Sequence, residues 1–207
     1  MRINGRLAVI LCGVSLLLAM PAFADSTSSF SFTSSLGNIG TSDNFTSGGL
    51  SLTATGYSSP GSTTDMFAKN EGATEMGIGI AGAADNEIAG TSFIQLNLQS
   101  ILAANPSSLI LAISSLQAGE TYNVWGSNTA GSLGTLLASN QSTATFDLSS
   151  FSQYGYISIV SPNASVLIGG LTVTTPTSNS VPEPGSAALL LSGLAFLAGI
   201  GLVAKKL

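Results

Sequence analysis

One stretch of the chain decides the fold class: Phe93-Ile94-Gln95-Leu96-Asn97-Leu98. Aliphatic side chains stand at every second position, which is the period of a β-strand with one buried and one solvated face. On this interpretation Gln95 points to solvent. A second run, residues 109–113, is apolar at all five positions, which predicts a central strand that is covered on both faces.

Comparable short runs recur at intervals of about ten residues, between breaks rich in glycine, serine, asparagine and proline. Residues 98–104 are the exception and predict a helical turn. The pattern predicts an all-β fold, specifically a jelly-roll-like β-sandwich. The predicted strands span residues 29–34, 50–57, 76–80, 92–98, 108–114, 121–126, 133–138, 143–148, 156–161 and 166–174.

Residues 1–24 have the organisation of a signal peptide. Arg2 and Arg6 precede an uncharged apolar run, residues 7–19, which is too short to cross a bilayer well. Small residues then stand at the two positions that signal peptidase reads. The residues at the predicted cleavage site are Ala22, Ala24 and Asp25, with Asp25 first in the mature chain.

The C-terminal tail, residues 181–207, has three parts. Two prolines in Val181-Pro182-Glu183-Pro184 disfavour helix and predict an extended, accessible segment. Residues 187–204 carry no charge, and a helix of that length can cross a bilayer. Lys205 and Lys206 follow as a stop-transfer signal, which places the C-terminus in the cytoplasm. The remaining chain is assigned to an ectodomain, residues 25–174, and a linker, residues 175–180.

This tail resembles the PEP-CTERM sorting signal in the order of its motif, its leucine-rich run at residues 189–194 and its basic end. The resemblance implies one partner, an exosortase, which is a membrane cysteine transpeptidase that recognises and removes the tail. It also implies export across the inner membrane, transient anchoring through the C-terminal helix, and then a cell-surface or extracellular location. The family usually ends in several arginines, whereas this chain ends in two lysines and Leu207.

Charge and composition exclude several classes of function. Residues 25–180 hold nine acidic residues and a single base, Lys69, so electrostatic binding to nucleic acid is excluded as a main function. The chain has no histidine, and its one cysteine, Cys12, lies in the predicted signal peptide. Ser-His-Asp triads, Cys-His dyads and histidine-containing zinc sites are therefore excluded. We expect the chain not to be an enzyme.

Five of the acids lie close together in the sequence, at Asp65, Glu71, Glu75, Asp85 and Glu87. Three interpretations stay open. The acids can be solvated loop residues; Asp85, Asn86 and Glu87 can bind a structural Ca²⁺, the one cofactor considered; or two carboxylates can act as the acid pair of a glycoside hydrolase. The neighbouring Gly-x-Gly-x-x-Gly pattern at residues 77–82 is interpreted as small residues in a strand and a turn, not as a nucleotide site.

Trp125 is the other candidate site. Strand alternation places it on a mostly polar face with Thr121 and Asn123, so its indole could stand in solvent. An exposed indole can stack on the C–H face of a sugar, and Asn123 could bind the hydroxyl groups. The alternative is that Trp125 packs against the loop at residues 127–134.

The ectodomain has a weaker resemblance to domains that PEP-CTERM proteins often carry, which are similar to carbohydrate-binding jelly rolls. The hypothesis is a structural or adhesive matrix protein that acts in exopolysaccharide or biofilm. The alternative is a carbohydrate-binding module, and a glycoside hydrolase ranks last. Expected partners are exopolysaccharide or a cell-surface glycan, besides the membrane through the C-terminal helix. The segments that carry this resemblance are residues 69–72, 85–88, 93–98, 119–122 and 126–129.

Overall fold

The computed structural model describes residues 25–33, 35–72, 74–176 and 193–194. Residues 25–176 form one compact unit, and the fold described below is that of this unit. The predicted signal peptide, Val181–Pro184, Lys205 and Lys206 lie outside the described residues. No helix among the described residues has the length and hydrophobicity needed to cross a bilayer.

The unit consists of two antiparallel sheets and three short helical turns, α2 (Gln99–Leu102), η1 (Ala84–Asn86) and η2 (Ser149–Phe151). In the first sheet the strand order is β13 (Thr145–Asp147), β10 (Ser108–Ser114), β15 (Ser165–Pro176), β7 (Met76–Ile80), β6 (Met66–Asn70) and β2 (Gly37–Gly40); β1 (Asp25–Ser31) and β8 (Ile88–Ala89) also pair with β15. In the second sheet the order is β12 (Thr135–Gln141), β11 (Tyr122–Ser127), β14 (Tyr156–Val160), β9 (Phe93–Asn97), β4 (Leu50–Ser59) and β3 (Ser42–Ser47); β5 (Ser62–Thr63) pairs with β4.

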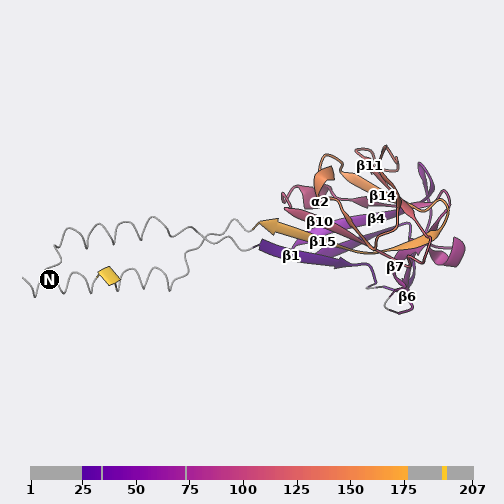
Figure 1. The fold of residues 1–207 in the computed structure, drawn as a ribbon, viewed down its shortest axis with the longest axis horizontal. Coiled ribbons are helices and arrows are strands. Elements are labelled where there is room, and N and C mark those ends of the chain that lie inside the picture. The colour runs from indigo at the N-terminus through magenta and orange to yellow at the C-terminus, as the bar shows by residue number, and fades with distance from the viewer. Residues whose placement is uncertain (1–24, 34, 73, 177–192, 195–207) are drawn as a thin grey trace, which may run out of the picture. The chain divides into compact units, whose positions relative to one another are not determined.

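The last strand, β15, organises the first sheet because it pairs with β1, β7, β8 and β10. Asp25 lies opposite Pro176, so the two ends of the domain lie side by side at one end of β15 (Figure 1). The other end of β15 pairs through Ser165 and Val166 with β8. The segment just before β8, which contains Glu87, therefore lies at the end of the domain far from both termini.

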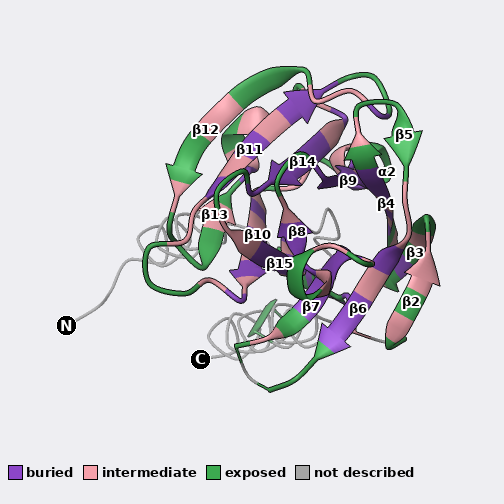
Figure 2. Ribbon diagram, turned by 90° about the vertical axis from the view of Figure 1, so that its right-hand side faces the viewer, coloured by how far each residue is buried: buried purple, intermediate pink, exposed green. Residues whose placement is uncertain are grey.

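One hydrophobic core fills the space between the sheets. The first sheet contributes residues such as Ile78, Leu111 and Leu171, and the second contributes Leu52 and Leu96, all at most 1% exposed. In Figure 2 buried positions gather where the two sheets face each other, while β12 lies at the margin. The all-β class and the packing of two antiparallel sheets are thus as predicted. The order of the strands within each sheet was not predicted and follows from the observed pairing.

All ten predicted strands are present, and two, β7 and β10, have the predicted bounds. The predicted helical turn is α2. The missed strands are β2, β3, β5, β6 and β8; all except β6 are short or polar, whereas β6 has five residues of which three are buried. In β3, for example, Phe45 is the only buried residue, and pairing with β4 defines the strand. β15 also continues to Pro176, so Thr175 and Pro176 belong to the sheet and not to the predicted linker.

Two burial predictions are wrong. The run at residues 109–113 was expected to be covered on both faces, but Ile110 and Ala112 are only partly buried, because the outer face of β10 is incompletely covered. Conversely, Gln95 is 2% exposed and not solvated, because a loop covers the outer face of the second sheet there.

Candidate functional site

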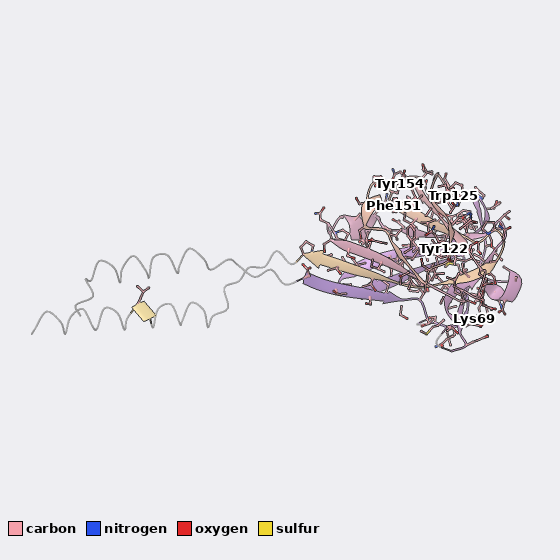
Figure 3. The ribbon with its side chains drawn as sticks, in the orientation of Figure 1. Lys69, Tyr122, Trp125, Phe151 and Tyr154 are labelled. Atoms are coloured by element: carbon pink, nitrogen blue, oxygen red, sulfur yellow. The ribbon has the colours of Figure 1, made fainter. Side chains whose placement is uncertain are left out.

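The only base of the ectodomain, Lys69, lies at the centre of a group of carboxylates. Its side chain is 3% exposed although it carries a full charge. Figure 3 shows Lys69 at the β6 side of the domain, well apart from Trp125. Burial of an ammonium ion is costly unless carboxylates neutralise it and accept its hydrogen bonds. The four acids that do so are Asp85 at 2.9 Å, Glu75 at 3.1 Å, Glu87 at 3.3 Å and Glu71 at 3.7 Å from Lys69 Nζ.

These carboxylates differ in exposure. Glu87 is 1% exposed, whereas the side chains of Glu71 and Asp85 are 64% and 69% exposed. Ser115 Oγ donates a hydrogen bond of 2.6 Å to Glu87 Oε1, the same oxygen that Lys69 contacts. Glu87 Oε2 is buried without a hydrogen-bond partner among the described residues. The inner part of this group, which we call the Lys69 network, therefore consists of Lys69, Glu87 and Ser115.

The backbone around the Lys69 network explains the glycine pattern. A Cβ atom on Gly79 would lie 2.6 Å from the Cα atom of Glu87, so only glycine lets the turn at residues 84–87 approach β7 this closely. Asp85 adopts a positive φ of 53°, and Asn86 one of 56°, which the short acidic and amide side chains tolerate. These contacts place Asp85 and Glu87 beside Lys69.

Electrostatics keep Lys69 charged. Burial by itself would lower the pKa of Lys69, but hydrogen bonds to Asp85, Glu75 and Glu87 outweigh it and raise the pKa above its ordinary value. The ammonium ion therefore persists throughout the neutral range. It joins β6, the turn after β6 and the segment before β8 in a chain without disulfides.

Two of the three predicted Ca²⁺ ligands, Asp85 and Glu87, lie close together, and Glu75 joins them. Glu75, Asp85 and Glu87 each place one carboxylate oxygen within 4.8 Å of the others, which is suitable spacing for a hard cation. Asn86 Oδ1 accepts a hydrogen bond of 2.9 Å from the backbone N–H of Gly82, so this oxygen is engaged within the turn. Any Ca²⁺ bound here would have to share the carboxylates with Lys69 or displace its ammonium group.

The glycoside hydrolase hypothesis meets the same obstacle. An acid pair must hold the glycosidic oxygen and, in one class, a water molecule between its two carboxyl groups. Here the ammonium of Lys69 lies between the converging carboxylates. Asp65, the fifth acid of the predicted cluster, lies elsewhere and accepts a hydrogen bond of 2.8 Å from Asn38 Nδ2.

A second small core lies on the outer face of the second sheet. It consists of Tyr57, Phe93 and Val160, with Trp125 and Leu133 packed against them, and we call it the outer-face cluster. The rings of Tyr57 and Phe93 stack with centroids 4.8 Å apart and planes at 13°. Trp125 is thus partly buried. It packs beside Leu133 of the loop at residues 127–134, as expected if Trp125 is not an open platform for sugar.

The loop between β11 and β12 covers the outer-face cluster, and Gln95 holds it in place. Gln95 Nε2 donates to the carbonyl of Ser132 at 2.9 Å and to Ser158 Oγ at 3.1 Å. Its Oε1 accepts from the N–H of Gly131 at 2.8 Å. Gln95 therefore holds the loop between β11 and β12 in position, a role that strand alternation alone could not identify. Phe93, an apolar residue on the same face, was the one sequence signal that this face is covered.

The polar groups around Trp125 are largely committed to the fold. Asn123 Oδ1 accepts a hydrogen bond from the N–H of Asn140, and this contact joins β11 to β12. Trp125 Nε1 is buried without a partner among the described residues. Sugar binding through Trp125 and Asn123 stays a prediction, and it would have to use the exposed part of the indole ring, because Nε1 is buried.

Comparison with known proteins identifies the tail. Residues 180–206 match the family model of the PEP-CTERM protein-sorting motif, which confirms the predicted sorting signal. The motif suggests an exported protein that is targeted to an exosortase. No curated protein and no solved structure matches the chain significantly.

The Lys69 network makes a prediction about stability. Lys69→Met leaves Glu87 as a buried, uncompensated carboxylate, so we expect the free energy of unfolding of the mature ectodomain to fall by about 3 kcal/mol. Glu87→Gln in the Lys69→Met background removes that charge and should restore part of the loss. Chemical denaturation followed by circular dichroism measures both effects. Equal stability of Lys69→Met and wild type would contradict the assigned role of Lys69.

The Ca²⁺ hypothesis can be tested in the same variants. If Glu75, Asp85 and Glu87 can hold Ca²⁺, millimolar Ca²⁺ should raise the melting temperature of Lys69→Met above its value in chelator. The wild type should respond less, because its ammonium ion competes with the metal ion. Addition of Asp85→Asn to Lys69→Met should abolish the response. If Ca²⁺ does not change the melting temperature of Lys69→Met, the Ca²⁺ hypothesis is wrong.

Proposed function

We propose that this PEP-CTERM motif protein is processed by an exosortase and that its ectodomain then serves a structural or adhesive role in an exopolysaccharide matrix. One observation carries the proposal: the sorting motif begins at residue 180, directly after a compact unit that ends at Pro176. A folded domain followed at once by a sorting signal is the organisation expected of a protein that is exported and then processed at its tail.

The arrangement of the two ends supports delivery by the tail. Because Asp25 pairs with Pro176, the mature N-terminus and the start of the tail leave the domain at the same end. An attachment through the tail would hold that end towards the membrane. The opposite end, with the Lys69 network, would then point outward.

The surface chemistry supports a matrix role. Only 7% of the residues of the chain are charged, and the exposed strand positions are mostly serine, threonine and asparagine. Such hydroxyl and amide groups can exchange hydrogen bonds with glycans and with water at little net cost. No histidine or mature cysteine is available for nucleophilic chemistry, which favours a binding or structural role.

Processing can be tested with the full chain in a host that contains an exosortase. Substitution of both Pro182 and Pro184 by alanine removes the backbone constraint that we expect the enzyme to recognise, so the protein should be retained in the membrane at full tail length. The matched control is Pro176→Ala, a proline at the end of β15, which should be processed normally.

Intact mass of the mature protein is the measurement. We expect the wild type and Pro176→Ala to start at Asp25 and to lack the residues after the cleavage site. A mature wild-type protein that still contains residues 187–207 would refute processing. If processing occurs and deletion of the gene leaves the cohesion of the matrix unchanged, the structural role fails while the sorting role stands.

A carbohydrate-binding role is the second candidate, favoured by one observation. Trp125 retains some exposure, and its cross-strand neighbour Leu136 on the same face is 44% exposed, so this face offers an apolar surface beside an indole. Stacking on a sugar needs an accessible aromatic ring, and this is the one tryptophan of the chain.

The test compares two substitutions in the outer-face cluster. Trp125→Ala should abolish retention on immobilised native exopolysaccharide if the indole binds the glycan. Leu133→Ala loosens the same cluster but keeps the indole, so it should retain binding. The melting temperature of each variant shows whether a loss of retention is caused by unfolding of the domain. Equal retention by Trp125→Ala and the wild type would remove this candidate function.

A further inference from the structure

The folded ectodomain ends very close to the sorting motif. Pro176 still pairs with Asp25, and only residues 177–180 separate it from Val181. From Pro176 to Val181 the chain can span at most about 18 Å. A small protein domain is about 30 Å across, so its surface extends roughly 15 Å from a central cleft. An enzyme that holds Val181 in such a cleft therefore lies against the end of the ectodomain.

Three turns surround the point at which the tail leaves, and each is tied to β15 or to β1. The carbonyl of Thr174 accepts a hydrogen bond of 2.8 Å from the N–H of Ser107. Ser149 Oγ accepts one of 3.0 Å from the N–H of Leu109, which lies opposite Val173. The turn between β3 and β4 packs on β1. Figure 1 shows α2, which is part of the second turn, towards the end where β15 stops.

We call these three turns the terminal face, which comprises residues 47–50, 98–107 and 148–155. The face is held together internally, because the N–H of Leu98 donates to the carbonyl of Gly155 at 2.8 Å. Its exposed positions carry glycine, alanine, serine, asparagine or glutamine, and none of its residues is charged. The four acids around Lys69 lie at the other end of the domain. Close contact at the terminal face therefore leaves no charge of this chain without solvent or a counter-ion.

Two bodies lie within reach of this face, the enzyme that holds the motif and the bilayer. Binding to a bilayer needs basic residues or exposed large apolar side chains. The terminal face has no basic residue, and among the described residues the exposed large hydrophobic side chains all lie elsewhere. The absence of charge only permits contact. The short connection to the motif is what selects the enzyme as the partner.

We propose that the terminal face is a docking surface for the membrane enzyme that removes the tail, which then contacts the folded ectodomain as well as the motif. This inference rests on the proposed function, namely processing by an exosortase. Because one short chain joins the two contacts, binding of the motif gives the face a high effective concentration at the enzyme. Weak contacts at the face are then enough to prolong the binding of the motif.

The test follows removal of the tail from the full chain in a host that contains an exosortase. Ala103 and Ser152 are exposed on the terminal face. Ala103→Glu and Ser152→Glu should each slow removal by about tenfold, because a close protein contact cannot solvate an uncompensated charge. The matched control is Ala118→Glu, at an exposed alanine beyond the far end of β10, which should be processed at the wild-type rate. Pulse-chase labelling measures the rates.

Arginine at the same position distinguishes the enzyme from the bilayer. Ala103→Arg should slow removal as Ala103→Glu does, because bulk and charge of either sign disturb a close protein contact. A face that only lies near anionic lipid would be repelled by glutamate and attracted by arginine. Opposite effects of the two substitutions would therefore assign the face to the bilayer and overturn the proposal.

A spacer separates docking from recognition of the motif. About twelve glycine and serine residues inserted after Pro176 let the enzyme bind the motif away from the domain. In this background Ala103→Glu should be processed as fast as its parent. Equal slowing with and without the spacer would show that Ala103→Glu acts by another route, against docking. Melting temperatures of the purified variants verify that each one folds.

The results also separate this inference from the proposed function. A wild-type chain that keeps its tail would refute processing itself. If the wild type is processed, and Ala103→Glu and Ser152→Glu are processed at the same rate as Ala118→Glu, docking at the terminal face is wrong while processing stands.

Discussion

The pairing of β15 with its neighbours is the constraint on which the rest of the domain depends. β1, β7, β8 and β10 all pair with this last strand, and its side chains Ile168, Leu171 and Val173 are at most 1% exposed in the core. The first sheet therefore cannot close until the final residues of the domain are available for pairing, because the first and last strands meet in it.

The Lys69 network stabilises the far end of the domain by a different interaction. A cysteine-free ectodomain cannot join its segments covalently, and a single buried ammonium joins four carboxylates from the turns around it instead. Neutralisation of the one buried acid, Glu87, matters most, because an unpaired buried carboxylate is far more costly than an exposed one. The acids that looked like a metal or catalytic cluster in the sequence thus have a counter-ion within the chain.

The outer face of the second sheet carries a second hydrophobic cluster. Gln95 ties the loop between β11 and β12 over Tyr57 and Phe93, which gives this face a second hydrophobic layer. The same hairpin ends in the neutral edge strand β12. Trp125 and Leu136 lie opposite each other in the pair of β11 and β12, so the indole and an exposed leucine share this face.

The sequence by itself determined the all-β class, the bounds of β7 and β10 and the sorting motif, because period-two alternation, turn residues and short linear motifs are local properties. Tertiary structure alone decided which strands are neighbours, which face of β9 is covered and what surrounds Lys69. Strand alternation assigned Gln95 to solvent because it cannot register a loop that returns from residues 131–132 to cover it. Likewise, the acids from Glu71 to Glu87 could be counted, but only the approach of the turn at Gly79 brings Glu87 to Lys69, since contacts between distant segments depend on the whole fold.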